Sequence, residues 1–228
     1  MQIILIPAAI VLLLVGISLW SRYTRLRRES HIRGAELPRG LFDKLKARHP
    51  HLSTKDCQLV AHGLRQFFLA HLKSGRAFVS MPSQVVDDLW HEFILYTRHY
   101  QAFCGSAFGR FFHHSPAAIL SGDRQRNEGL RRCWWYACKE ENINPKSPTR
   151  LPLLFALDAK LGIPGGFHYL ADCSGVRRED GAAGSSATYC GGDFSSHSFD
   201  GGTDGFGDAS SGDGSGGDGC GGGGCGGD

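Results

Sequence analysis

The sequence lacks charge at one end and lacks positive charge at the other. No charged residue precedes Arg22, and no lysine or arginine occurs from Gly181 onward. There is no repeated strand–helix unit and no internal repeat of about 20 to 50 residues, so nothing indicates a parallel α/β sheet or a solenoid. The sequence also contains no H-E-x-x-H segment and no paired C-x-x-C segments. These absences exclude the zinc motifs that a sequence alone would identify.

The uncharged start is a continuous apolar run, MQIILIPAAIVLLLVGISLW. About 20 apolar residues rising ~1.5 Å each match the ~30 Å hydrocarbon core of a bilayer. Trp20 and Tyr23 follow at the depth expected for an interfacial aromatic belt. A cleavable signal peptide is the alternative, but it requires basic residues before the apolar core and small residues at the cleavage site. The sequence therefore predicts a transmembrane anchor over residues 1–21, with the lipid bilayer as its partner.

Four arginines follow this anchor closely: Arg22, Arg25, Arg27 and Arg28. No lysine or arginine precedes it, so the positive-inside rule places the rest of the chain in the cytosol and a short N-terminus outside. We expect the four arginines to contact anionic lipid headgroups. The predicted location is the cell (inner) membrane, with one span and a cytoplasmic C-terminal domain. In that compartment the eight cysteines are expected to be free thiols or metal ligands.

Composition divides the remaining chain into three parts: a basic juxtamembrane linker at 22–40, a helical domain at 41–175 and a tail at 176–228. Apolar residues at helical spacing, together with capping residues such as Ser53 and Ser83, predict about five helices in the domain. The expected segments are 41–48, a helix from Ser53 or Thr54 to about 73, a long helix from Ser83 to about Cys104, 126–141 and 152–161. The predicted fold class is all-α.

The C-terminal tail is rich in glycine and acidic. Nineteen of the 32 glycines and seven aspartates lie between Gly181 and Asp228. Its few apolar residues, Tyr189, Phe194, Phe199 and Phe206, are isolated, and they are not expected to bury enough surface to offset the chain entropy of folding. The tail is therefore predicted to be disordered, with the role of its Cys220 and Cys225 left open.

One segment of the domain is distinctive. It contains Asp87, Trp90 and His91, followed by Tyr100 and Cys104 and then by the pair His113–His114. This order of D-x-x-W-H, Y-x-x-x-C and a later histidine resembles the glycine-rich domain-containing protein-like family, best known from plants, over residues 41–116. Plant members tend to read W-H-x-H, whereas this sequence has Phe93. The resemblance implies no established activity, so it suggests a family without a mechanism.

The spacing within this segment allows a physical reading. Asp87 and His91 are four residues apart, so they share a helix face and the carboxylate can accept a ring N–H. His91 points away from the apolar stripe of its helix, which predicts a surface or a site covered by another segment. On a straight helix Cys104 is ~20 Å from His91, too far for both to bind one zinc ion.

The best metal-ligand set that the sequence offers joins His91 to one of His113 and His114, and to one of His62 and His71. It would leave an open position, as catalytic zinc requires. A Cys–His nucleophilic arrangement of Cys104 with His113 or His114 is a further possibility. The alternative to a metal or catalytic site is that these residues have a structural or interaction role.

Two functions from different classes follow. The favoured one is non-enzymatic: the domain binds or scaffolds a protein partner at the membrane and needs no cofactor. The alternative is a zinc-dependent or Cys/His hydrolase with its site around His91 and His113/His114. Nucleic acid is not an expected partner, because no recognised binding module surrounds Arg131–Arg132 and the tryptophans that follow them.

Overall fold

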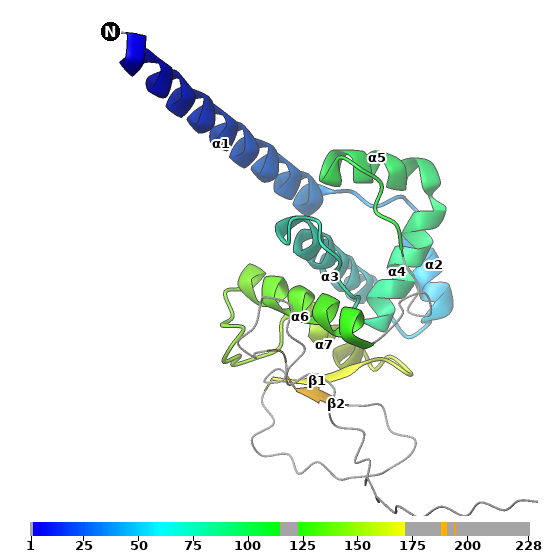
Figure 1. The fold of residues 1–228 in the computed structure, drawn as a ribbon. Coiled ribbons are helices and arrows are strands. Elements are labelled where there is room, and N and C mark those ends of the chain that lie inside the picture. Colours follow the sequence, from blue (N-terminus) through cyan, green and yellow to red (C-terminus); the bar gives the residue numbers. More distant parts are fainter. Residues whose placement is uncertain (1, 115–122, 172–187, 191–193, 195–228) are drawn as a thin grey trace, which may run out of the picture.

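The computed structural model describes residues 2–114, 123–171, 188–190 and 194. Its order of elements is α1 (Gln2–Gly34), α2 (Leu41–Arg48), α3 (Thr54–Lys73), α4 (Gln84–Leu95), α5 (Thr97–Phe108), α6 (Asp123–Glu140), α7 (Leu153–Leu161), β1 (His168–Leu170) and β2 (Thr188–Cys190). Figure 1 shows α1 projecting from a domain in which the other helices gather around α3. The fold is mostly helical.

The central helix of the domain is α3, which contacts α1, α2, α4, α6 and α7. A capping box begins it: Ser53 Oγ accepts from the backbone N–H of Asp56, whose carboxylate accepts from the N–H of Ser53. Twelve of its 20 residues are buried, which a helix at the edge of a domain could not achieve. The buried Gln66 ties it to its neighbours, because its amide donates to Glu141 and accepts from the backbone N–H of Leu154.

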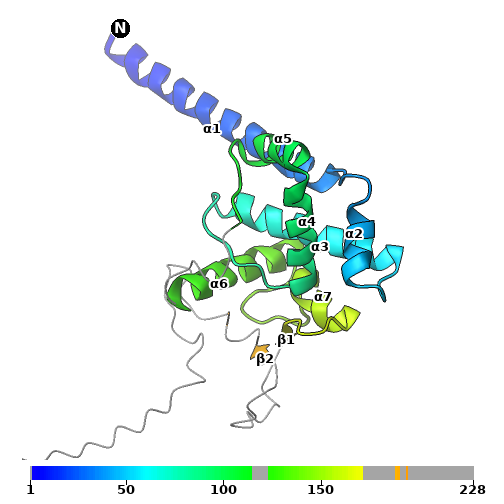
Figure 2. The same ribbon diagram turned by 90° about the vertical axis from the view of Figure 1, so that its right-hand side faces the viewer.

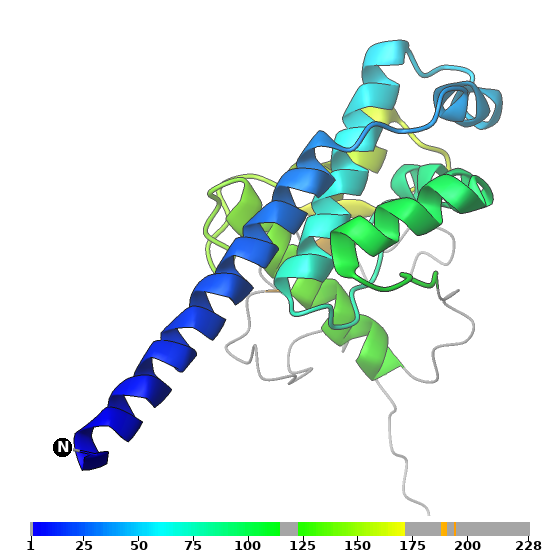
Figure 3. The same ribbon diagram turned by 90° about the horizontal axis from the view of Figure 1, so that it is seen from above.

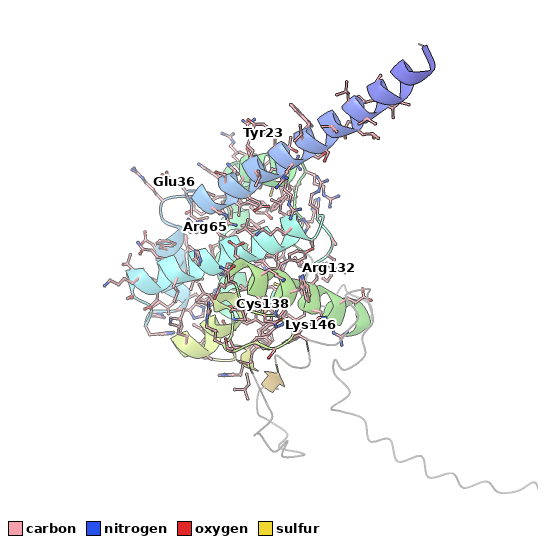
Figure 4. The ribbon with its side chains drawn as sticks, turned by 90° about the vertical axis from the view of Figure 1, so that its left-hand side faces the viewer. Tyr23, Glu36, Arg65, Arg132, Cys138 and Lys146 are labelled. Carbon is pink, nitrogen blue, oxygen red and sulfur yellow. The ribbon has the colours of Figure 1, made fainter. Side chains whose placement is uncertain are left out.

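The stretch Ala9–Gly34 of α1 is long and apolar enough to cross a membrane. Its large apolar side chains from Ile10 to Leu26 are exposed, with Trp20 and Tyr23 at 69% and 60%. Figure 2 shows this part as a rod leaving the domain. In Figure 4 Tyr23 lies on that rod, whereas Cys138, which is fully buried, lies within the packed helices.

The last turns of α1 belong to the domain, which differs from the linker expected at 22–40. Helix α1 continues to Gly34, and Ile32 is fully buried in the core. Glu29 lies 3.7 Å from Lys73 of α3, and Lys73 in turn pairs at 2.7 Å with Glu140 of α6. Arg33 pairs with the same Glu140. The helix therefore enters the domain without a flexible joint.

The single helix predicted from Ser83 to Cys104 is wrong: it is broken at Tyr96 into α4 and α5. Tyr96 has ψ of 58°, and its N–H bonds the carbonyl of Phe93 instead of continuing the helix. No glycine or proline marks the break. It is explained by packing, because the turn brings the buried rings of Phe93 and Tyr100 within 5.2 Å of each other.

Two further expectations need correction. The fold is not all-α, since β1 and β2 form a short parallel pair with Tyr169 opposite Tyr189. The isolation predicted for Phe194 is also wrong. Its ring is 5% exposed and lies 5.1 Å from Trp134, so it completes an aromatic cluster with Phe155. The domain therefore includes parts of the chain beyond 175, and the rest of the predicted tail lies outside the described residues.

Candidate functional site

Three polar side chains from two segments meet at one point on the domain surface. Asp87 and His91 come from successive turns of α4, and His114 comes from the segment that follows α5. Asp87 Oδ1 is 3.1 Å from His114 Nε2, and Asp87 Oδ2 is 3.5 Å from His91 Nδ1. The two imidazole rings are 4.3 Å apart between centroids. The carboxylate thus contacts both histidines, and their rings also contact each other.

The side chains of this cluster are of the types that bind transition metals. Within the described part of the chain it is the one group of three potential ligands whose donor atoms all lie within 4.8 Å of one another. Donor atoms about 2.0–2.1 Å from a tetrahedral zinc ion are themselves about 3.4 Å apart, and the donor atoms of these residues, one from each, lie within 4.8 Å of one another. The side chains of Asp87, His91 and His114 are 23%, 43% and 18% exposed, so the point where they meet is open to solvent on one side.

Helix α4 is held at its N-terminus by two side chains. Ser83 Oγ accepts from the N–H of Val86, as its predicted capping role requires. Asp158 of α7 reaches the same turn and accepts from Ser83 Oγ at 2.7 Å and from the N–H of Gln84 at 2.7 Å. Asp87 lies in this first turn, so Asp158 fixes the backbone that carries one of the three site residues.

A chain of hydrogen bonds holds the segment that carries His114. Trp90 Nε1 donates to Tyr100 Oη at 3.1 Å, and Tyr100 Oη donates to the carbonyl of Phe112 at 2.6 Å. The ring of Trp90 also meets that of His114, with centroids 4.7 Å apart. Burial raises the pKa of Tyr100 and keeps its hydroxyl protonated as a donor. Trp90 and Tyr100 therefore form a clamp around the His114 segment.

Cys104 lies next to this clamp and lacks the features of a nucleophile. Its side chain is fully buried beside Tyr100. Burial raises the pKa of the thiol, whereas a reactive cysteine needs a lowered pKa and access to solvent. This disfavours the arrangement of Cys104 as a nucleophile with His113 or His114.

The other candidate histidines do not join the cluster. His113 is exposed, and its ring lies against Phe111 at 4.7 Å between centroids. His62 is exposed on α3, whereas His71 is buried in the core. The ligand set of His91 with a histidine of α3 is therefore not found, and Asp87 takes the third position. Sequence reasoning treated Asp87 as the residue that orients His91.

His71 instead supports the opposite side of the clamp. Its Nδ1–H donates to the carbonyl of Ala77 at 3.0 Å, and its ring stacks on Phe112 at 3.9 Å between centroids. Burial, the largest cause, lowers its pKa to about 4, and the charges of Arg110 and Arg76 lower it further, against a hydrogen bond to Ala77 that raises it. The neutral ring thus packs flat against the segment that leads to His114.

Acidification is expected to destabilise the protein through His71. The folded pKa of about 4 lies below the ordinary value of 6.5, so the unfolded chain binds more protons between these values. Stability is therefore lost as pH falls through 6.5, and by pH 5 the free energy of unfolding should be about 2 kcal/mol lower than at pH 7.5. Urea unfolding at both pH values measures this change in the full chain in detergent.

The matched variants are His71→Asn and His62→Asn, two histidines of the same helix. His71→Asn removes the buried ring and should flatten the pH profile between 7.5 and 5. His62→Asn changes an exposed ring and should leave the wild-type profile. A profile that stays equally steep in His71→Asn would contradict the assignment.

A second ionic cluster lies beside the site without belonging to it. Asp88, the neighbour of Asp87, is 5% exposed and faces α2, where its carboxylate is 2.8 Å from His49 Nε2 and also pairs with Arg48. These contacts fasten α4 to α2. Asp87 and Asp88 therefore have different surroundings, one at the histidine cluster and one in a structural contact.

The fold and the cluster define a helical domain that follows an apolar helix and carries two histidines and a carboxylate at one surface point. A family model described as UCP032817-like matches residues 27–194, most of the chain, and the protein belongs to this uncharacterised family. The match gives no support to the glycine-rich domain resemblance. No curated protein and no solved structure matches the chain.

The limits of the family match agree with the packing. It begins at position 27, where α1 approaches the domain, and ends at position 194, where Phe194 enters the aromatic cluster. Sequence reasoning missed Phe112 and Asp158, which hold the site in place. Their partners lie 12 and about 75 residues away along the chain, and no local motif announces either contact.

Proposed function

We propose that this is a single-pass membrane protein whose helical domain binds a zinc ion through Asp87, His91 and His114. The observation that carries the proposal is the convergence of three donor groups from two segments within 4.8 Å. Two imidazoles and a carboxylate are ligands that zinc accepts, and three protein ligands leave a fourth position for water or for a partner's side chain.

The role at the membrane is the binding of a protein partner, with the metal centre as part of the docking surface. The partial exposure of His91 supports this role, because a fourth ligand from outside can reach the ion. The apolar part of α1 supports the anchor, and the arginines that follow it favour a cytoplasmic domain whose base contacts anionic headgroups. A zinc-bound water at the same position is the enzymatic alternative, which hydrolysis assays of the zinc-loaded protein would reveal.

Metal analysis tests the proposal. The full chain, purified in detergent with Cys220→Ser and Cys225→Ser so that tail thiols cannot contribute, is loaded with zinc and desalted. We expect about one equivalent of zinc to remain bound, and His91→Ala or His114→Ala to remove it. His113→Ala is the matched control, because this neighbouring histidine faces Phe111 and should leave the zinc in place.

Two outcomes of the metal analysis would contradict the proposal. A zinc-free wild-type chain would leave a hydrogen-bonded Asp–His cluster with a purely structural role. If zinc stays bound in His114→Ala but is lost in His113→Ala, the ligand is His113 and the proposed site is wrong.

A further inference from the structure

The ends of α3 and α5 lie at the side of the domain from which the apolar part of α1 projects. Both helices run antiparallel to α1. On α3, Arg65 bonds the carbonyl of Ala35, whereas Lys73 lies beside Glu29. Figure 3 shows α3 and α5 with their C-terminal ends toward the projecting half of α1.

The contacts of α5 with α1 show the same antiparallel direction. Phe103 meets His31, with ring centroids 5.6 Å apart, and a Cβ at Gly109 would come within 2.8 Å of the Arg28 guanidinium. Arg28 is seven residues, or about 10 Å of helix, beyond the expected end of the span at Ser21. Because the headgroup layer is about 5–7 Å thick on each side of the hydrocarbon, the two helix ends lie just outside it.

Two arginines occupy this end of the domain. Arg76 follows α3 and donates to the carbonyl of Phe108, and Arg110 follows α5 and donates to the carbonyl of Arg76. Each bond uses one of the five N–H donors of a guanidinium, and among the described residues no carboxylate is in salt-bridge contact with either.

We propose that Arg76 and Arg110 bind the phosphates of an anionic phospholipid bilayer and hold this end of the domain on the membrane. The proposal rests on the membrane anchor of the proposed function and extends it from the helix to the folded domain. Three features support it: the two cations continue the arginine-rich surface of α1, they have donors left for phosphate, and the rigid passage of α1 into the core presents them at a fixed height.

A pair of exposed positions on one helix tests the contact. Ser106 lies near the C-terminus of α5 and Thr97 at its N-terminus, about 13 Å apart along the helix. Each is replaced by cysteine in a full chain that carries Cys173→Ser, Cys190→Ser, Cys220→Ser and Cys225→Ser, and is labelled with a fluorophore. The four remaining cysteines are buried and should not react. The proteins are placed in nanodiscs that contain a lipid with a nitroxide on its headgroup.

In nanodiscs containing phosphatidylglycerol, quenching at position 106 should exceed that at position 97 by about twofold or more. The difference should fall in pure phosphatidylcholine and in the Arg76→Gln/Arg110→Gln double variant. The difference should persist in Arg76→Lys/Arg110→Lys, which keeps the positive charge but weakens the hydrogen bonds to the carbonyls of Phe108 and of residue 76.

Equal quenching at both positions would overturn the proposal, and so would quenching at 106 that ignores both the lipid charge and the glutamine variants. A chain that does not insert into nanodiscs would instead contradict the membrane anchor, so failure of the anchor is seen separately. If the lysine variant remains folded but loses the membrane contact as the glutamine variant does, the arginines act through their hydrogen bonds to backbone carbonyls and not as phosphate ligands.

Discussion

Asp158→Ala is expected to lower the free energy of unfolding by about 3–5 kcal/mol, because each buried donor left without an acceptor costs about 1–3 kcal/mol. The Asp158 carboxylate is 1% exposed. Its Oδ1 accepts from Ser83 Oγ and from the N–H of Val85, and its Oδ2 accepts from the N–H groups of Gln84 and Phe167. Removing it leaves four buried or half-buried donors without their acceptor.

The first turn of α4 would lose most of its cap in this variant. The four N–H groups at a helix start have no partner within the helix, and here two of them depend on a side chain from α7. Because Asp87 lies in that turn, zinc affinity should fall together with stability.

Urea unfolding of the full chain in detergent, followed by tryptophan fluorescence, measures the effect. Asp158→Asn should have an intermediate effect, since one oxygen remains to accept. Asp43→Ala, an exposed aspartate in the first turn of α2, is the control and should change stability by less than about 0.5 kcal/mol. A loss below about 1 kcal/mol in Asp158→Ala would mean that the carboxylate does not hold α4.

The local signals of the sequence were sufficient to locate most helices. Ser53 with Asp56 and Ser83 both predict helix starts that the structure confirms, because a cap depends on residues within the same turn. The break at Tyr96 has no such signal. It arises because Phe93 and Tyr100 both pack into the core, and this depends on elements far away in the sequence.

The choice between His113 and His114 shows the same limit within the site. In an extended segment alternate side chains face the same side, so Phe112 and His114 point one way and His113 the other. Burial alternates accordingly: residues 111 and 113 are exposed, and residues 112 and 114 are half-buried. The sequence F-F-H-H is compatible with either register. The bond from Tyr100 to the carbonyl of Phe112 and the stacking of Phe112 on His71 select one of them.

The motif D-x-x-W-H, Y-x-x-x-C and H thereby acquires a physical interpretation. Asp87, His91 and His114 meet at the cluster, and the remaining members hold His114 there. Trp90 contacts the ring of His114, and Tyr100 fixes the backbone two residues before it. The motif thus divides into residues that form the cluster and residues that position one of them.

Tyr100→Phe is expected to weaken zinc binding by about 10- to 100-fold, the usual effect of removing a group that orients a metal ligand. The variant keeps the buried ring but removes the hydroxyl, so the carbonyl of Phe112 loses its donor and Trp90 Nε1 loses its acceptor. One buried and one half-buried group left unpaired should also lower the free energy of unfolding by about 1–3 kcal/mol.

Titration of the full chain with zinc against a chelator of known affinity gives the first quantity, and urea unfolding gives the second. Tyr96→Phe is the matched control, because the Tyr96 hydroxyl donates one exposed bond of 3.5 Å to the carbonyl of Arg39. This substitution should change neither zinc affinity nor stability. If Tyr100→Phe lost stability but bound zinc as tightly as the wild type, Tyr100 would stabilise the fold without positioning His114. An equal loss of affinity in Tyr96→Phe would instead point to a general loosening of the α4–α5 turn.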